Sequence, residues 1–250
     1  MKLQNVLLLI CCVFLMYSCQ FTETIYINDD GSGKMSFAFD GSQLMEMGGN
    51  DMMGADEKVV DSTIVFKDFL EAKKDSIAAL PQAEQERLKA LEDFKMHMLI
   101  DPKTQKMVMD MYTEFDDVDG LQDMFNLMNQ ANTLNSQDDE AQKGANPFSD
   151  LASGEATQVD YTYKNNVFKR KVEIIDQAKL DAVTDSIGDA EMMLAASTYV
   201  LNYHFPKRIK SVSLEQAKFS EDHKSFSAEV NFKAYITNPE SLNVEVILED

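Results

Sequence analysis

Tryptophan is absent from this 250-residue sequence, and histidine and cysteine are scarce, with three of each. The histidines stand far apart, at His97, His204 and His223, without the close spacing of a metal-ligand set. Two of the cysteines, Cys11 and Cys12, lie in an N-terminal apolar run. The sequence therefore predicts no metal site.

Positive charge is also scarce. The chain has 23 lysines and arginines against 43 aspartates and glutamates, which gives a formal net charge of −20. A surface this acidic is repelled by the phosphates of nucleic acids and by anionic lipid headgroups. We therefore exclude nucleic acid as a partner, while basic partners remain compatible with the charge.

Catalytic and cofactor motifs are missing as well, beginning with the G-x-S-x-G elbow of a serine nucleophile. Gly31-Ser32-Gly33-Lys34 has the letters that end a phosphate loop, but the segment joins two predicted strands and lacks the first glycine of that motif. Asp116-Asp117-Val118-Asp119-Gly120 looks like the start of a calcium loop, but Phe115 and Asn126 occupy its first and twelfth ligand positions. We predict no catalytic residues and no cofactor, although an enzyme built on paired carboxylates stays open.

The N-terminus has the organisation of a secretion signal. Lys2 supplies positive charge, and an almost unbroken apolar run extends from Val6 to Met16. This run is too short to span a bilayer as a permanent helix. We predict a signal peptide over residues 1–18 that is cut before Cys19, which leaves one cysteine and no intramolecular disulfide. Stability must then come from a hydrophobic core.

Met16-Tyr17-Ser18-Cys19 resembles the lipobox of bacterial lipoproteins. The resemblance implies lipidation of Cys19, with diacylglycerol on the thiol and a further acyl chain such as palmitate on the new amino group. These chains anchor a protein stably to a membrane, because each buried methylene contributes about 0.8 kcal/mol. By the same analogy, Gln20 in place of an aspartate implies the outer membrane. Glu23 alone is a poor match to an acidic surface-export signal, which favours the periplasmic face.

Alternating apolar and polar residues predict β-hairpins along most of the chain. The predicted strands cover residues 21–28, 35–40, 94–100, 107–111, 159–163, 167–174, 198–205, 209–212, 225–236 and 242–248. Helical spacing predicts helices over residues 64–80, capped by Asp61 to Thr63, and over 81–91, 118–131 and 176–195. This order indicates an α+β fold, in which amphipathic helices pack on a largely antiparallel sheet built from hairpins.

Composition divides the chain into four parts. After the signal peptide, residues 19–133 form an N-terminal α+β half, and residues 156–250 form a C-terminal β-rich half. Residues 134–155 are rich in Asn, Gln, Asp, Ser and Gly, so we interpret them as a mobile linker or long loop. Two domains and a single fold across both halves stay open, since the last strands could close on the first.

Methionine is unusually abundant, with sixteen in the chain. Five of them occupy alternate positions on two predicted strands: Met96, Met98, Met107, Met109 and Met111. Thioether side chains suit an irregular core, a face for an apolar ligand or a malleable partner surface, and they can also bind cuprous copper. We expect core packing first and an apolar-ligand or partner face second.

Two further segments carry a resemblance. Thr24 to Gly33 directly after the lipobox, and Tyr203-His204-Phe205-Pro206 followed by Ser220 to Ser225, are similar to segments of uncharacterised lipoproteins of Bacteroidota and of LppM-like lipoproteins. The second resemblance implies a helix-on-sheet fold that can enclose an apolar cavity. It implies no particular site residues.

Taken together, the sequence predicts a membrane-anchored lipoprotein that acts as a non-catalytic binding or scaffold component of an envelope protein complex. One alternative is a carrier of a lipid or other apolar ligand. The other is the carboxylate-based envelope enzyme.

Overall fold

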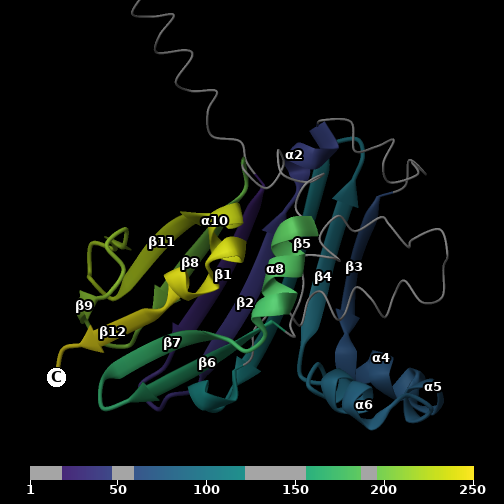
Figure 1. The fold of residues 1–250 in the computed structure, drawn as a ribbon, viewed down its shortest axis with the longest axis horizontal. Helices are drawn as coiled ribbons and strands as arrows, with labels where there is room; N and C mark the ends of the chain where they lie inside the picture. The colour runs from purple at the N-terminus through teal and green to yellow at the C-terminus, as the bar shows by residue number, and fades with distance from the viewer. Residues whose placement is uncertain (1–18, 47–58, 122–155, 187–195) are drawn as a thin grey trace, which may run out of the picture.

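The computed structural model describes residues 19–46, 59–121, 156–186 and 196–250. These residues form two β-sheets, one of eight strands and one of four, together with short helices (Figure 1). All neighbouring strands but one pair are antiparallel. The predicted α+β class and largely antiparallel sheet are confirmed.

The large sheet joins strands from both halves of the chain. Its strands, in spatial order, are β10 (Lys218–Phe219), β11 (Ser225–Asn231), β8 (Thr198–His204), β1 (Gln20–Ile27), β2 (Gly33–Asp40), β5 (Lys106–Phe115), β4 (Lys95–Asp101) and β3 (Val60–Val65). The exceptional parallel pair is β1 with β8, whose registered residues run from Gln20 opposite Thr198 to Tyr26 opposite His204. A strand of the C-terminal half thus lies beside the first strand of the N-terminal half.

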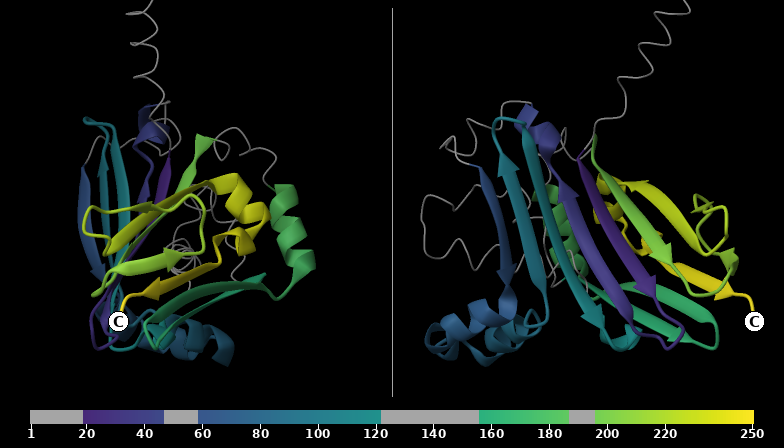
Figure 2. Two further views of the ribbon diagram at one scale, coloured as in Figure 1. Left: turned by 90° about the vertical axis from the view of Figure 1, so that its left-hand side faces the viewer. Right: turned by 180° about the vertical axis from the view of Figure 1, so that it is seen from behind.

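The small sheet lies across one face of the large sheet. Its strands, in order, are β6 (Thr157–Lys164), β7 (Val167–Ile174), β12 (Val244–Leu248) and β9 (Ile209–Val212). Helices α8 (Gln177–Ser186) and α10 (Phe232–Thr237) lie on the same side, as the edge-on view in Figure 2 shows. The other face of the large sheet is turned toward the viewer in the right-hand view of Figure 2, with none of the described elements in front of it.

The remaining helices lie at the two ends of the large sheet. Helix α2 (Ser42–Leu44) follows β2 at the end where β1 begins, whereas α4 (Phe66–Ala72), α5 (Lys74–Ala78) and α6 (Gln82–Lys89) cluster at the opposite end (Figure 1). Two 3₁₀ turns cover Val118–Gly120 and Pro239–Leu242. Pro81 stands immediately before α6, where its fixed φ suits a helix start and its missing N–H costs no hydrogen bond.

Aromatic side chains fill the space between the layers. Alternate residues of β1 and β2 point inward, and the rings of Phe21 and Phe37 are fully buried. The ring of Phe21 stacks on Phe232 of α10 with 4.0 Å between centroids, and Tyr199 of β8 packs tilted against Phe37. Burial of such large apolar surfaces supplies a hydrophobic core, on which the stability of the fold depends.

Two predicted elements are wrong. Asp61 to Thr63 do not cap a helix but lie inside β3, where backbone pairing with β4 and the neighbouring β-branched side chains favour a strand. The predicted strand over residues 225–236 stops at Asn231, and residues 232–237 form α10 instead. The Asn231 side chain accepts a hydrogen bond from the Ala234 amide (3.1 Å), which caps that helix.

Several predictions fall outside the described residues. These are the signal peptide, the linker over 134–155, the part of the 118–131 helix beyond residue 121 and the part of the 176–195 helix between residues 187 and 195.

Candidate functional site

Cys19, the predicted lipidation residue, lies directly before β1 and is buried. Its carbonyl oxygen accepts a hydrogen bond from the Thr198 amide (3.0 Å), so pairing with β8 begins at the cysteine itself. The folded sheet therefore starts without a spacer. If acyl chains are attached at Cys19, this end of the sheet faces the membrane.

The five methionines divide into two groups. Met96 and Met111 are opposite each other on β4 and β5, and both are fully buried in the core. Met98, Met107 and Met109 are half-buried on the same face of the sheet. Packing thus accounts for the first two, and the apolar-ligand or partner role of the others stays a prediction.

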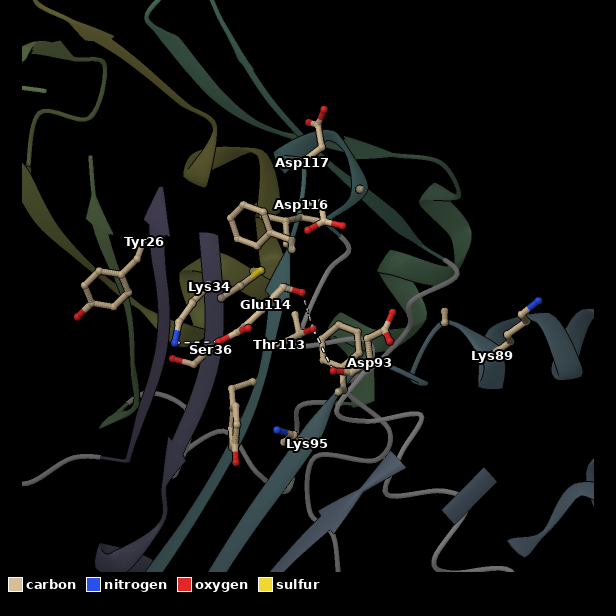
Figure 3. Close-up of a pocket in the computed structure, with 17 residues that line it drawn as sticks. Tyr26, Lys34, Ser36, Lys89, Asp93, Lys95, Thr113, Glu114, Asp116 and Asp117 are labelled. Atoms are coloured by element: carbon tan, nitrogen blue, oxygen red, sulfur yellow. Dashed lines mark hydrogen bonds and ion pairs between the residues drawn. The ribbon is translucent and has the colours of Figure 1, made fainter. Parts of the chain in front are cut away.

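A groove of about 950 Å³ is lined by Tyr26 and Lys34, which lie near the β1–β2 turn at the end of the large sheet remote from Cys19. Figure 3 shows its lining residues. The groove is bounded by the β1–β2 end of the sheet, the end of β5, the start of β4, the end of α6 and the loop that includes the first 3₁₀ turn. Tyr26 of β1 and Lys89 of α6 lie at opposite sides of this groove. Its volume exceeds the roughly 300 Å³ at which ligand pockets begin.

Four large apolar side chains are among the residues that line the groove, and we call them its floor: Met35, Phe94, Phe115 and Leu121. Met35 stands at an inward-pointing position of β2. Phe94 is held in the turn after α6, where its amide donates a hydrogen bond to the Leu91 carbonyl (2.9 Å). Phe115 and Leu121 contribute from the end of β5 and the loop beyond it. An apolar floor favours a ligand or peptide that has an apolar segment to bury.

The rim of the groove carries both signs of charge. Lys34 and Glu114, opposite each other on β2 and β5, form an exposed ion pair with 2.9 Å between Nζ and Oε1. Hydrogen bonding and charge attraction within this pair lower the pKa of Glu114 and raise the pKa of Lys34. Lys89, Lys95, Asp93, Asp116 and Asp117 are also at the groove.

Two polar groups of the groove act on the backbone. The Thr113 hydroxyl is directed at the Asp93 carbonyl oxygen (3.2 Å), which holds the start of β4 against β5. Asp117 accepts a hydrogen bond from the Asp119 amide (2.9 Å) and caps the 3₁₀ turn, and the Asp119 carboxylate pairs with Lys164 of β6. The Asp116 to Gly120 segment is thus a capped turn braced by the small sheet.

The three histidines are held in different places. His97 hydrogen-bonds Asp61 with 2.9 Å between Nε2 and Oδ1, His204 stacks on Tyr26, and His223 stacks on Phe219. Burial lowers the pKa of His204. Within the four described ranges, no group of three or more His, Cys, Asp or Glu side chains is placed to hold a metal ion.

One buried cluster was missed at the level of sequence. Between the two sheets, the Glu23 carboxylate accepts hydrogen bonds from the hydroxyls of Tyr161 (3.0 Å), Tyr199 (2.7 Å) and Tyr203, and it lies beside the Arg170 guanidinium. The signal was visible, because Glu23 stands at an inward position between Phe21 and Ile25, and Arg170 stands between Phe168 and Val172. Since both charged side chains are almost fully buried, the cluster joins the sheets and offers no open site.

The comparisons with known proteins add little to this geometry. A scan against protein-family models gives no match, and no curated protein matches the sequence. The folded domain of LppM from Mycobacterium tuberculosis, solved by NMR, is a weak structural neighbour with a TM-score of 0.34 and 9% sequence identity, over 94% of this chain and 92% of that chain. The weak LppM-like resemblance is thereby confirmed, and at this score it carries no conclusion about ligand or activity. Among the described residues, no helix is both long enough and apolar enough to cross a bilayer.

Proposed function

We propose that this chain is a membrane-anchored lipoprotein, held by acyl chains on Cys19, that binds a partner of the cell envelope without catalysing a reaction. The N-terminal pattern supports the anchor: Lys2, the apolar run from Val6 to Met16, and Cys19 at its end. Gln20 favours the outer membrane, with the domain on the periplasmic face. The groove is the binding surface.

The observation that carries this proposal is the path of β1. The strand begins one residue after Cys19 and extends without interruption to Tyr26, which borders the groove. Seven residues of extended chain at 3.3 Å each place the groove about 23 Å from the anchor. The groove therefore opens at the end of the domain that is turned away from the membrane, where a partner protein has free access.

The groove suits a segment of protein better than a small metabolite. It is open, it joins an apolar floor to a rim of mixed charge, and its lining includes the aromatic residues Tyr26 and Tyr112. This mixture of aromatic, apolar and charged side chains is typical of protein interfaces. The partner is accordingly a peptide segment of an envelope protein, with an apolar side chain for the floor and charges that complement Lys89 and Asp93.

The test is site-specific photo-crosslinking in cells. A photoreactive amino acid at Tyr112, which lines the groove, is expected to give one reproducible adduct with an envelope protein, and the same group at Glu221, in a turn outside the groove, is not. The double variant Lys89→Glu and Lys95→Glu should reduce the yield of this adduct, because it reverses exposed charges at the rim.

Lys67→Glu, at an exposed position on α4 outside the groove, is the matched control and should leave the adduct unchanged. Equal crosslinking from Tyr112 and Glu221, or a yield that does not respond to the rim charges, would contradict the proposal.

A further inference from the structure

The end of the large sheet that carries Cys19 has a defined set of residues at one level. Strand register aligns Gln20 with Asp40, Asp40 with Val108, Val108 with Leu99 and Leu99 with Asp61. One residue closer to the end, the Gly41 amide donates to the Met107 carbonyl (2.9 Å), and Ile100 is opposite both Met107 and Val60.

Cys19 precedes Gln20, so it lies at the level of the row formed by Met107, Ile100 and Val60. The row at the level of the cysteine is therefore apolar across β5, β4 and β3.

Apolar side chains lie on both faces of the sheet at this end. Ile100 and Met107 are half-buried on the face that also carries the core, and Leu99 and Val108 are half-buried on the opposite face. Val59 and Val60 at the start of β3 are exposed to 51% and 38%. We call these six residues the apolar rim. A sheet with one face toward water ordinarily carries apolar residues on its other face alone, so the rim departs from that rule.

The hairpin between β4 and β5 extends beyond the apolar rim and presents cations. Lys103 and Lys106 are exposed there. Asp101 is the one carboxylate of this hairpin turn, and it accepts hydrogen bonds from the Lys103 amide (3.0 Å) and the Thr104 hydroxyl (2.7 Å). The bond from the hydroxyl is the main reason that the pKa of Asp101 is lowered. The chain as a whole has a net charge of −20, but at this hairpin tip the lysine side chains are exposed to solvent and the aspartate is hydrogen-bonded within the turn.

From these observations we infer that the apolar rim is a membrane-contact surface whose occupant is the lipid bilayer. The inference rests on the proposed anchor at Cys19. Val59 and Val60 enter the upper acyl region. Lys103 and Lys106, which lie beyond them on the hairpin, extend their long side chains back so that the ammonium groups meet lipid phosphates. Four strand spacings of 4.8 Å place β3 about 19 Å from β1. A second contact at that distance holds the tethered domain upright and keeps the groove directed away from the membrane.

The test uses the full lipidated protein in phosphatidylcholine vesicles, with and without brominated acyl chains. Val60→Cys and Asp29→Cys each introduce one thiol for an environment-sensitive fluorophore. Asp29 is exposed in the β1–β2 turn at the opposite end of the sheet and is the matched control. An acylated Cys19 takes no label even in the unfolded chain, whereas a free thiol that is buried in the fold becomes reactive there. Labelling of the parent protein in urea therefore reports whether the anchor exists.

The inference predicts a blue-shifted probe at Val60→Cys that brominated lipid quenches, and no quenching at Asp29→Cys. Absence of quenching at both positions in a protein that floats with the vesicles would overturn the membrane contact and leave the anchor intact. Quenching at both positions would mean that the domain lies on its side, which also overturns it. A blue-shifted probe at Val60→Cys that brominated lipid does not quench would mean that the apolar rim is covered by this chain or by a second copy of it, which also overturns the inference.

A second variant tests whether quenching requires the apolar rim or results only from the short distance to the anchor at Cys19. With the probe at Lys103→Cys, adding Val59→Asp should abolish quenching while the protein still floats with the vesicles. Ile175→Asp, which changes an exposed apolar residue outside the apolar rim in the same way, should not. Val59 precedes β3 and is half exposed, so thermal unfolding should show an intact fold. Unchanged quenching in Val59→Asp would overturn the role of the apolar rim in membrane contact. Failure to float, together with a labelled Cys19, would instead remove the proposed anchor and this inference with it.

Discussion

Glu23 and Arg170 form an ion pair inside the molecule, with 3.4 Å between Glu23 Oε1 and Arg170 Nε and at most 2% of either side chain exposed. The residues come from different sheets, Glu23 from β1 and Arg170 from β7. Within the described part of the chain, Arg170 Nε forms no hydrogen bond, whereas its Nη1 donates to the Leu242 carbonyl (3.0 Å). Burial acts to lower the pKa of Arg170, but attraction to Glu23 and to the surrounding tyrosines holds it well above the ordinary value.

Removing the arginine should therefore cost more than removing any exposed ion pair. Arg170→Met leaves the Glu23 carboxylate buried without its cation, and the free energy of unfolding should fall by about 3–5 kcal/mol. Glu114→Gln, which breaks the exposed pair with Lys34, should cost less than about 1 kcal/mol. Urea unfolding measures both.

The double variant Glu23→Gln and Arg170→Met should lose less stability than Arg170→Met alone, because it leaves no uncompensated charge. Equal losses for Arg170→Met and Glu114→Gln would contradict a role for this pair in joining the sheets.

The tyrosines around Glu23 predict a response to alkaline pH. Burial, followed by repulsion from Glu23, raises the pKa of both Tyr199 and Tyr203 well above 10.0. The folded state then holds these protons more tightly than the unfolded state, so their contribution is fully present below the unfolded pKa and is lost as pH rises above about 10. Tyr203→Phe should reduce this alkaline loss and should cost about 1.5–3 kcal/mol at neutral pH, the value of a hydrogen bond to a charged group.

Urea unfolding at a series of alkaline pH values tests this expectation. Tyr26→Phe is the control, because Tyr26 is half exposed. An identical pH dependence for Tyr203→Phe and the parent protein would refute it.

The hairpins could be predicted because local sequence patterns encode them. Contacts between segments that are distant in the sequence could not be predicted. Alternation in β1 and β2 depends on neighbouring residues alone, and the predicted hairpin forms as expected. The parallel pairing of β1 with β8 joins opposite ends of the chain, and no local signal encodes it. Helix α10 was missed because the alternation of β11 continues into it, although Asn231 is a recognisable cap.

The groove could not be predicted for the same reason. Met35 and Phe115 come from β2 and β5, and Phe94 directly precedes β4, so the order of these strands across the sheet had to be known first. The Glu23 and Arg170 pair was within reach, since each is a charge at an inward strand position, and a buried charge needs a partner. The lipidation prediction at Cys19 was the easiest to make from the sequence, because it rests on a short local motif.

Asp110 predicts a stabilising substitution. Burial raises the pKa of its carboxyl, attraction to His97 opposes that change, and Asp110 Oδ1 has no hydrogen-bond partner in the described part of the chain. A raised pKa means that the charged form destabilises the fold at neutral pH, and that this cost disappears as pH falls through the raised pKa. Asp110→Asn should therefore raise the melting temperature at neutral pH, and the gain should shrink as the pH approaches 3.8. A gain that is independent of pH would point to another cause.

Gly33 predicts a steric requirement at the groove. A Cβ at this position would lie 2.0 Å from the Tyr26 carbonyl oxygen and 2.6 Å from the ring of Phe115. Because backbone cannot move as freely as a side chain end, Gly33→Ala should destabilise the domain by about 1–3 kcal/mol. Gly120→Ala is the control, since nothing lies within 4 Å of its added Cβ. Equal melting temperatures for the two variants would contradict the close packing of β1, β2 and β5.

The anchor at Cys19 is the claim on which the orientation of the domain depends, and the mass of the N-terminal peptide of the mature protein tests it most directly. The account predicts a chain that begins at Cys19 and carries a diacylglyceryl group and an amide-linked acyl chain, and it predicts that Cys19→Ala accumulates as an uncleaved or soluble form without fatty acid. A mature chain that begins at another residue, or an unmodified Cys19 in a protein that fractionates away from membranes, would contradict it.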